Sequence, residues 1–357
     1  MTCWHAFQTA TVTKLDNKYK VAGCCRAKGV GYTDSIENIK NFEPMQEFRK
    51  KFLDGIEPSE CFSCYEKEEA GVPSKRTKSL PMFDHDPIDV NKNGFVNHHL
   101  VSWDIRPEST CNLKCLMCNP NLSSKWEEDK DIWNKYFTKE RNKYQQPDWN
   151  YIYNNTVGTA KRIYIAGGEP FYIKNVVRYL DKLSKNKFNV ENTKLVIQTN
   201  GTTSDYRLLE VCKKFKMFDL CVSIDGVGEV DDIIRYPGKW NNKLRLWQEF
   251  KNITNYLTIS TTVQALNLPD LDNLLLHFDK DIVSFNKLVD PDFLSLNALK
   301  PEIIKDVKEN TSIPEIKQFC NDYNYDEALN ITMQKYLLDC DNKRETNSKE
   351  TLPWCFV

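Results

Sequence analysis

The chain has 357 residues, of which 40% are hydrophobic and 28% charged, as in a globular protein with one large domain and a smaller one. Its 49 Lys and Arg residues nearly balance 50 Asp and Glu residues, and the net charge of −1 argues against nucleic acid as a partner held by bulk electrostatics. No stretch approaches the roughly 20 apolar residues of a membrane span, and residues 1–14 lack the apolar centre of a signal peptide. We therefore expect a cytoplasmic protein without a membrane partner.

Residues 1–75 are predicted to form a small cysteine-rich module, and residues 76–97 a linker. The linker is inferred because residues 72–97 combine Pro, Gly, Asp and Asn with little periodicity. The chain holds 13 cysteines, and without a secretion signal metal binding is a better explanation for them than disulfides. Five of them lie in the first module: Cys3, Cys24, Cys25, Cys61 and Cys64.

From residue 98 to residue 299 the pattern alternates between strands and helices. Strands are expected at 99–105, 162–166, 194–199, 219–224, 257–265 and 281–288. Helices are expected between them at 121–137, 173–184, 204–215, 239–256 and 269–278. This alternation predicts an α/β core with a parallel sheet and outer helices. Residues 300–357 are expected to be a helical C-terminal extension, with helices at 303–308, 314–321 and 327–338.

Chemistry in such sheets lies beyond the carboxyl ends of the strands. Four segments follow predicted strands and so fall at that end: the loop with Cys111, Cys115 and Cys118, then Gly167-Gly168, Asn200-Gly201 and Asp225-Gly226. We expect the functional site there.

The three loop cysteines are spaced Cys-x3-Cys-x2-Cys. A cubane iron–sulfur cluster has four irons and normally takes four thiolates, so a loop that offers three leaves one iron open to a small molecule. The alternative is a structural zinc site. Zinc prefers four closed ligands, and three thiols without a nearby His make a poor set for it.

This loop, together with the later sequence Gly167-Gly168-Glu169-Pro170, resembles the radical S-adenosylmethionine (SAM) enzymes. The resemblance implies a partial (β/α)6 barrel and a [4Fe–4S] cluster held by Cys111, Cys115 and Cys118. It also implies that the fourth iron chelates SAM. Reduction then cleaves SAM to methionine and a 5′-deoxyadenosyl radical, which abstracts hydrogen from a substrate.

The same resemblance assigns roles around SAM. The glycines and Glu169 hold the methionyl ammonium, Ser223 meets the ribose or carboxylate, and Arg235 pairs with the carboxylate, for which a planar guanidinium is suited. Met117 occupies a position that is often aromatic in the family and can pack on a ring. Asn267 lies at the strand end where the family positions adenine. The simpler alternatives are strand-end turns and a surface arginine. The implied SAM-binding set is Met117, Gly167, Gly168, Glu169, Ser223, Arg235 and Asn267.

The N-terminal cysteines resemble the auxiliary-cluster module called twitch, a shortened relative of the SPASM domain. That module usually follows the core, whereas here it comes first. The resemblance implies a second, fully ligated [4Fe–4S] cluster, but four sulfurs also suit tetrahedral zinc, and both remain open. The choice between Cys24 and Cys25 is open as well, with Cys24 favoured. The implied ligands are Cys3, Cys24, Cys61 and Cys64.

Three smaller expectations concern single residues. Cys212 and Cys221 fit core positions, as free cysteines often do. Cys355 either packs in a tail or acts as a donor to the active site. Lys75 and Arg76 either hold a substrate carboxylate or phosphate near the SAM sulfonium, or are solvated linker charges.

The function expected is an oxidoreductase-type hydrogen abstraction, with a peptide or protein side chain as the substrate of first choice. A nucleotide- or sugar-derived small molecule is the second choice, and a non-catalytic metal-binding interaction protein is the alternative outside enzymes. A reductant such as flavodoxin or ferredoxin is the expected partner.

Overall fold

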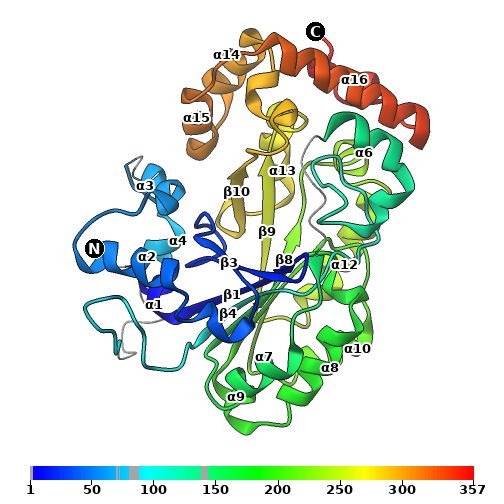
Figure 1. Ribbon diagram of the computed structural model, residues 1–357. Helices are drawn as coiled ribbons and strands as arrows, with labels where there is room; N and C mark the ends of the chain where they lie inside the picture. The colour runs from blue at the N-terminus through cyan, green and yellow to red at the C-terminus, as the bar shows by residue number, and fades with distance from the viewer. Residues whose placement is uncertain (1–2, 70, 72, 80–87, 138–143) are drawn as a thin grey trace. The chain divides into compact units, whose positions relative to one another are not determined.

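The computed structural model describes residues 3–69, 71, 73–79, 88–137 and 144–357 (Figure 1). These residues form an α/β protein whose strands pair mostly in parallel. The chain divides into two compact units. Unit 1 comprises residues 1–109, 142–198 and 205–219, and unit 2 comprises 110–141, 199–204 and 220–357. The predicted module, linker, core and extension boundaries stay predictions, and residues 80–87 of the predicted linker lie outside the described residues.

The sheet of unit 1 has the strand order β7-β6-β4-β1-β2-β3. Neighbours from β7 to β1 are parallel, whereas β2, β3 and β5 join by antiparallel pairing. The N-terminal segment therefore extends the core sheet, because β1 pairs along the whole of β4. The strands are β1 (Thr9–Leu15), β2 (Lys18–Val21), β3 (Gly31–Thr33), β4 (Ser102–Arg106), β5 (Tyr144–Gln145), β6 (Arg162–Ile165) and β7 (Lys194–Thr199).

The two faces of this sheet differ in chemistry. Side chains alternate between faces along a strand, and residues in register on neighbouring strands share a face. One face is apolar and buried, with Ala10, Val12, Trp103, Ile105, Ile163, Ile165, Leu195 and Ile197. The register puts Thr11, Asp104 and Tyr164 in one row of the other face, and Ser102 and Arg162 in the next. A polar face that is also buried is uncommon.

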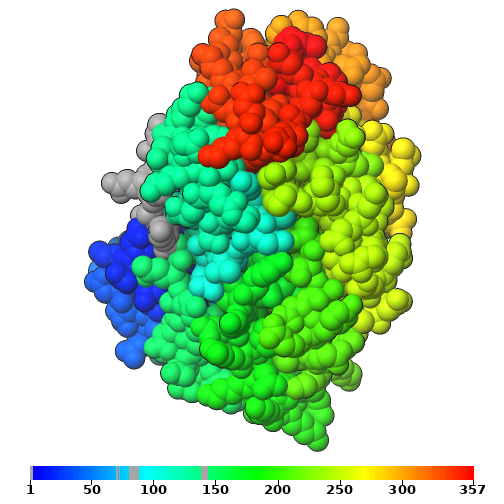
Figure 2. Space-filling model, turned by 90° about the vertical axis from the view of Figure 1, so that its right-hand side faces the viewer, coloured from blue at the N-terminus to red at the C-terminus, as the bar shows by residue number. Residues whose placement is uncertain are grey.

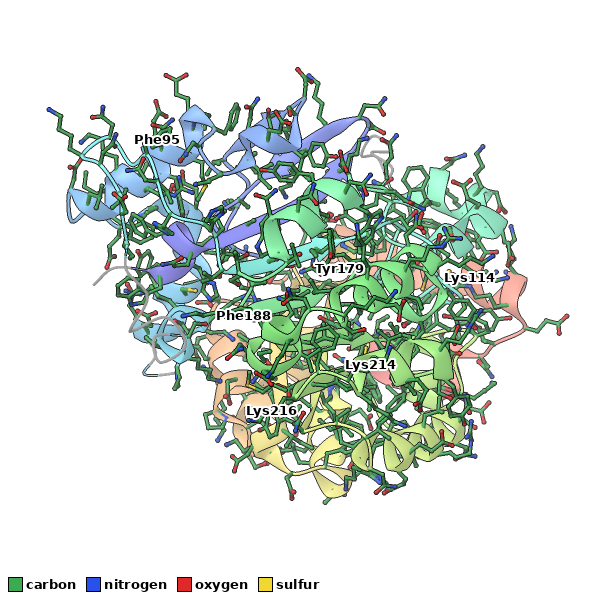
Figure 3. The ribbon with its side chains drawn as sticks, turned by 90° about the horizontal axis from the view of Figure 1, so that it is seen from below. Phe95, Lys114, Tyr179, Phe188, Lys214 and Lys216 are labelled. Atoms are coloured by element: carbon green, nitrogen blue, oxygen red, sulfur yellow. The ribbon has the colours of Figure 1, made fainter. Side chains whose placement is uncertain are left out.

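Helices α7, α8 and α9 lie on one side of these strands (Figure 1). The helix α7 is capped by Asp148, which accepts from the backbone N–H groups of Asn150 at 2.9 Å and Tyr151 at 3.0 Å. Tyr179 of α8, labelled in Figure 3, is buried, and its hydroxyl donates to Thr156 Oγ1 at 3.0 Å. The helices of unit 1 are α1 (Trp4–Gln8), α2 (Glu43–Leu53), α3 (Phe62–Glu69), α4 (Lys75–Lys78), α7 (Trp149–Thr156), α8 (Lys174–Leu183), α9 (Lys187–Asn192) and α10 (Tyr206–Cys212).

Unit 2 holds the strand neighbours β8, β9 and β10, with β9 and β10 parallel. The strands are β8 (Met217–Ser223, in this unit from residue 220), β9 (Tyr256–Val263) and β10 (Val283–Lys287). The helices are α6 (Lys130–Tyr136), α11 (Glu229–Ile234), α12 (Trp240–Lys251), α13 (Leu271–His277), α14 (Pro301–Asn310), α15 (Pro314–Asn321), α16 (Glu327–Arg344) and α17 (Ser348–Thr351).

An aromatic cluster lies in the core of unit 2 and joins α16 to the segment after the cysteine loop. Trp126 stacks on Tyr336 with ring centroids 6.4 Å apart, and Phe137 packs edge-on against Phe293 at 5.5 Å. The Tyr336 hydroxyl donates to the carbonyl of Leu116 at 2.8 Å. Figure 2 shows α16 and the residues after it, in orange-red and red, as one continuous surface. The outer side of α16 is thus solvent-facing, while its inner side supports the loop.

Most of the predicted strands and helices of residues 98–338 are confirmed to within a few residues. The predicted helix 121–137 instead consists of a 3-10 turn (Ser124–Asp129) followed by α6, and α16 runs on to Arg344. The strands β1 to β3 and the helices α7, α9 and α11 were not predicted. Among the described residues, no helix has the length and apolar character needed to cross a membrane.

Candidate functional site

The loop with Cys111, Cys115 and Cys118 is fixed in unit 2 by backbone pairing with the segment after α11. The backbone N–H of Leu116 donates to Ile234 at 2.8 Å, and that of Lys114 donates to Tyr236 at 2.8 Å. The residue between these two acceptors is Arg235. The fold therefore brings this predicted arginine to the cysteine loop through main-chain hydrogen bonds.

Side chains of the segment after the loop hold the loop, and Arg344 of α16 supports them. Lys114, labelled in Figure 3, donates to Asp129 at 2.8 Å, and Arg344 donates to the same carboxylate at 3.1 Å. The guanidinium of Arg344 also lies over the ring of Trp126, 4.7 Å from its centroid. Trp126 in turn donates its indole N–H to the carbonyl of Cys115 at 3.1 Å. Each contact restrains a loop position next to a sulfur.

Arg235 lies between carboxylates and thiols. Its guanidinium pairs with Asp225 at 2.8 Å and approaches Asp231 at 4.0 Å. Burial opposes the charge of Arg235, but Asp225, then the Cys115 thiol and Asp231, raise the pKa of this guanidinium. The arginine is therefore charged, and its field reaches the cysteine loop.

The thiols Cys115 and Cys118 interact directly. Their hydrogen bond lowers the pKa of Cys115 to about 7, against the effect of burial and with further help from Arg235 and Lys243. The same hydrogen bond, followed by burial, raises the pKa of Cys118. Thiolate is the form of cysteine that binds metal, so the positive charges nearby favour the ligand state. Within the described residues, no three His, Cys, Asp or Glu side chains are placed to hold a single metal ion.

The fit of SAM and a cluster to this loop rests on two observations. Three thiols without a disulfide stand on one tight loop, and Asn200 donates to the Cys111 sulfur at 3.8 Å. In addition, the buried Nε of Arg235 has no hydrogen-bond partner among the described residues. A guanidinium has five N–H donors, so this one has capacity for a further acceptor beside the thiols. A carboxylate suits that capacity.

The ends of β8 and β9 are joined by Asn267. Its amide donates to the carbonyls of Asp225 at 2.8 Å and Thr262 at 2.9 Å, and its Oδ1 accepts from the backbone of Gln264 at 2.9 Å. The side chain of Asn267 is thus used within the protein, and what this turn offers to a ligand is backbone. Ser223, the last residue of β8, is buried beside it.

Gln264 is a candidate that the sequence did not indicate. Its side chain is buried, and its Oε1 has no hydrogen-bond partner among the described residues. A glutamine at a strand end carries no pattern of its own, so only its burial without a partner identifies it. Met117, by contrast, is buried in the core of unit 2, with 8% of its surface exposed.

The Gly-Gly-Glu-Pro motif follows β6 in unit 1. Gly167 and Gly168 have φ angles of +107° and +54°, which side-chain-bearing residues rarely adopt, and this explains both glycines. Glu169 is fully buried, and its Oε1 accepts from the backbone of Phe171 at 3.2 Å. A fully buried carboxylate needs charged or hydrogen-bonding partners, and a ligand ammonium is one such partner.

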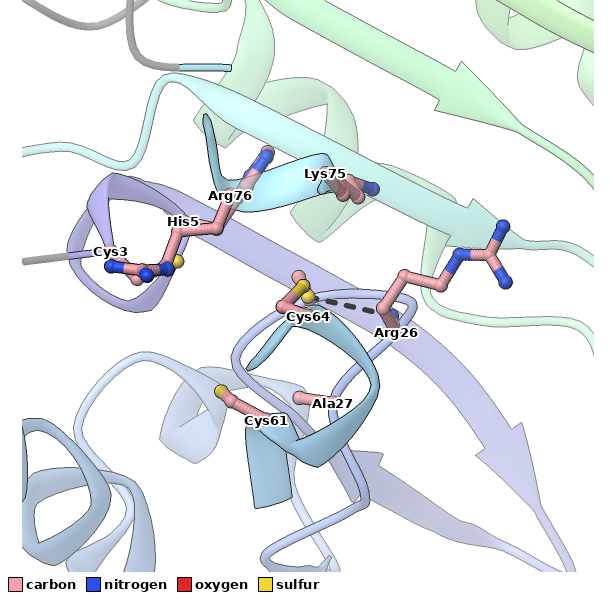
Figure 4. Close-up of a pocket in the computed structure, with 9 residues that line it drawn as sticks. Cys3, His5, Arg26, Ala27, Cys61, Cys64, Lys75 and Arg76 are labelled. Atoms are coloured by element: carbon pink, nitrogen blue, oxygen red, sulfur yellow. Dashed lines mark hydrogen bonds between the residues drawn. The ribbon is translucent and has the colours of Figure 1, made fainter. Parts of the chain in front are cut away.

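The four predicted N-terminal ligands line one pocket in unit 1 (Figure 4). They are Cys3, Cys24, Cys61 and Cys64, each with 6–7% of its surface exposed. Burial raises the pKa of Cys61, and the other three thiols add to the rise, as expected for sulfurs that are close neighbours. These four come from widely spaced parts of residues 3–64, and the fold brings them together.

Cys25 points elsewhere. Its sulfur accepts from the Lys75 ammonium at 2.7 Å, whereas Cys24 lines the pocket and its sulfur accepts from the backbone N–H of Arg26 at 3.4 Å. Three cationic side chains line the same pocket: Arg26, Lys75 and Arg76. His5 lines it as well, but burial and the nearby cations lower the pKa of its imidazole well below the usual value, so it adds no charge. Positive charge beside four thiolates fits an anionic cluster. Tetrahedral zinc, the alternative for four sulfurs, stays a prediction, because the described side chains do not converge on one metal-ion position.

The structure also describes the single residues for which the sequence analysis gave alternatives. Arg76 is buried and forms an ion pair with Glu68, so it is not a solvated linker charge. Cys212 is fully buried, as expected of a core residue, while Cys221 is partly exposed. Cys355 is also fully buried, and its thiol donates to the carbonyl of Ala265 at 3.8 Å, which is the tail-packing alternative.

Comparison with known proteins gives a family for part of the chain. Residues 107–275 match the model of the radical SAM superfamily, so a radical SAM domain spans them, and the resemblance read from the motifs is confirmed there. No curated protein matches. The twitch-like module, the auxiliary cluster and the partial barrel stay predictions.

Solved structures give weaker likenesses. One is anSMEcpe with bound AdoMet, at 21% identity and a TM-score of 0.42, covering 57% of this chain and 55% of that one. Another is Streptococcus suis SuiB bound to S-adenosylmethionine, at 16% identity and 0.39, covering 87% and 61%. A third is TYW1 with a lysine-pyruvate adduct, at 14% and 0.33, covering 72% and 91%. This chain spans about half the length of the first.

Lys243 pairs with Asp231, the carboxylate that Arg235 approaches, and replacing Lys243 should destabilise the protein. Lys243 and Asp231 form an ion pair in which both side chains are fully buried. Replacing Lys243 with Met leaves Asp231 charged and buried, which typically costs about 3–5 kcal/mol. We expect a large drop in the urea midpoint. Lys239→Met is the control, because Lys239 is 73% exposed and should matter little. Equal midpoints for the two variants would contradict this account.

Proposed function

We propose that the chain is a radical SAM enzyme that reductively cleaves SAM and abstracts hydrogen from a substrate. The observation that carries this proposal is the pairing of the three-cysteine loop with the segment of Arg235, whose buried Nε makes no hydrogen bond to a described residue. When bound, a [4Fe–4S] cluster and SAM supply the reductive cleavage to methionine and a 5′-deoxyadenosyl radical. The protein's own work is to hold these groups and to exclude water.

Each proposed binding residue is matched by charge to the group that it would hold. Cys111, Cys115 and Cys118 would hold the cluster, with the positive field of Arg235 favouring thiolates. Arg235 would take the SAM carboxylate, and buried Glu169 the methionyl ammonium. Ser223 and the backbone around Asn267 would contact the ribose and adenine, and Met117 would pack near them.

A second cluster in the N-terminal pocket is part of the proposal. Cys3, Cys24, Cys61 and Cys64 would ligate it fully, so it would serve electron transfer or structure. A peptide or protein side chain is the proposed substrate, with a nucleotide- or sugar-derived molecule as the alternative. Flavodoxin or ferredoxin would supply the electron.

The proposal is tested by anaerobic reconstitution with iron and sulfide, followed by dithionite and SAM. We expect formation of 5′-deoxyadenosine, measured by chromatography, together with iron and sulfide bound to the protein. A protein that takes up iron yet forms no 5′-deoxyadenosine with any reductant would count against the enzyme and favour a metal-binding interaction protein.

SAM affinity gives a second measurement. A buried charge-assisted hydrogen bond is typically worth about 1.5–3 kcal/mol, so Arg235→Ala or Glu169→Gln should each weaken SAM binding roughly 10- to 100-fold. Calorimetry on the reconstituted protein measures this. Arg245→Ala is the control, because Arg245 is 60% exposed and pairs with Glu249 on the surface. Unchanged affinity in both test variants would remove these residues from the site.

A further inference from the structure

The polar face of the sheet in unit 1 carries a second set of functional groups. Asp104 lies at its centre, in register with Thr11 on β1 and Tyr164 on β6. In the adjoining row Ser102 is in register with Arg162. Because residues in register on neighbouring strands share a face, these side chains point to the same side of three adjacent strands.

Several polar atoms on this face are buried without a hydrogen bond. Among the described residues, no hydrogen-bond partner is found for Thr11 Oγ1, Ser102 Oγ or Arg162 Nη1. The two carboxylate oxygens of Asp104 also lack a hydrogen bond, although Oδ1 forms an ion pair with Arg106 at 3.2 Å. Asp104 and Ser102 are fully buried, and Thr11 is 9% exposed. Each such group costs free energy unless it has a partner, and native proteins keep few of them. Several on one face indicate that a ligand completes the set.

Charge on this face is unbalanced. Three cations act on the Asp104 carboxylate: although burial opposes it, Arg106, Lys75 and Arg162 lower the pKa of Asp104. Arg106 contacts Asp104 at 3.2 Å. The Lys75 ammonium contacts the Cys25 sulfur and lines the cysteine pocket, so its charge is used there. Arg106 and Arg162 against Asp104 leave an excess of one positive charge on the face itself. The guanidinium groups of Arg106 and Arg162 also lie 5.2 Å and 5.1 Å from the centroid of the same ring, that of Tyr164.

The groups without hydrogen bonds indicate which functional groups a ligand of this face must carry. The excess of positive charge calls for an anion with oxygen acceptors, which Arg162 Nη1 can meet. The ionised Asp104 carboxylate has an ion-pair contact but no hydrogen bond, so it calls for a hydrogen-bond donor close to that anion. A plain dianion supplies only the first requirement, because it would meet the Asp104 carboxylate as a like charge.

We propose that this face binds a carboxylate together with an adjacent N–H donor, the combination found in an amino acid or in an acidic residue of a peptide. Arg162 contacts the carboxylate, Asp104 accepts from the N–H, and Ser102 and Thr11 complete the hydrogen bonds. The inference rests on the proposed function, because the group bound here belongs to the substrate of the same enzyme.

The test compares three probes on the purified chain at constant ionic strength: L-glutamate, glutarate and inorganic phosphate. Glutamate is glutarate with an ammonium group added, so net charge alone favours glutarate, whereas an N–H contact to Asp104 favours glutamate. We expect the dissociation constant, measured by ligand-detected NMR titration, to be lowest for glutamate. A preference for glutarate or phosphate, or no binding of any probe, would overturn the proposal.

Variants locate the binding. Arg162→Gln should weaken glutamate and glutarate alike by about 10-fold or more, as for loss of a charge-assisted contact. Asp104→Asn should remove the preference for glutamate over glutarate. Arg207→Gln removes the same charge from a side chain that is 78% exposed and should change nothing. Equal losses in Arg162→Gln and Arg207→Gln would show binding by net charge and contradict the assignment.

Two additions keep the test decisive. If a charge variant does not fold, Ser102→Ala removes one hydroxyl without changing charge and should weaken glutamate binding a few-fold. The probes need neither SAM nor iron. A wild-type chain that forms 5′-deoxyadenosine but does not prefer glutamate therefore refutes only this inference. A chain that prefers glutamate but cleaves no SAM refutes the proposed enzyme instead.

Discussion

Replacing Cys111, Cys115 and Cys118 together with alanine should abolish 5′-deoxyadenosine formation under dithionite. The reason is coordination: without these thiolates the loop has no ligands to hold a cluster next to Arg235. Anaerobic assays with a fixed excess of SAM and chromatography of the nucleoside products measure the effect. The loss should be to background, since no other group in the loop offers three sulfurs.

The matched control removes the same number of thiols elsewhere. Cys212→Ala, Cys221→Ala and Cys320→Ala together leave the loop and the N-terminal pocket intact, and this variant should keep its activity. Undiminished 5′-deoxyadenosine in the loop variant would reject the assignment. Loss in both variants, with a lowered melting temperature, would show that thiol removal acts through folding.

Iron content should separate the two cysteine groups. The reconstituted wild-type chain should bind about eight irons, the content of two cubanes, and the loop variant about four. Changing Cys3, Cys24, Cys61 and Cys64 to alanine should likewise leave about four, because each group holds its own cluster. Iron and zinc are measured by mass spectrometry after anaerobic desalting.

The metal found in the loop variant decides the nature of the N-terminal site. One zinc and no iron per chain would make the pocket a structural zinc site, and the auxiliary cluster would be wrong. Cys25→Ala is the control, since its sulfur contacts Lys75 outside the set of four. Its iron content should equal that of the wild type. A loss of four irons there would make Cys25 the ligand in place of Cys24.

The sequence predicted the elements in which apolar residues recur at the period of a strand or a helix, and the motifs whose residues have a fixed spacing. The strands from 162 to 288 follow from alternation of apolar runs and helical patterns, and Gly167 and Gly168 follow from a turn that demands positive φ. The cysteine spacing likewise led directly to the loop. Each of these patterns involves residues close together in the chain, so it can be recognised in a single sequence without knowledge of the fold.

What was missed depends on long-range contacts. The strand β1 alternates threonines with Ala10 and Val12, but this alternation is short and small in side-chain size, and the pairing of residues 9–13 with β4 completes the strand. Asp104 and Gln264 are single polar residues inside strand or turn patterns. Only the folded chain shows that they are buried without hydrogen bonds, so no spacing rule could have found them.

The anchoring of the cysteine loop has a consequence for how the protein is made. Tyr336, which supports the loop through the Leu116 carbonyl, comes 220 residues later in the chain. At about 5–20 residues per second, translation needs roughly 10–45 s to reach it. For that time the nascent loop lacks its anchors from α16, and its thiols are open to oxidation or to the wrong metal. We therefore expect cluster insertion to follow release from the ribosome, and its yield to depend on how well the growing cell protects those thiols.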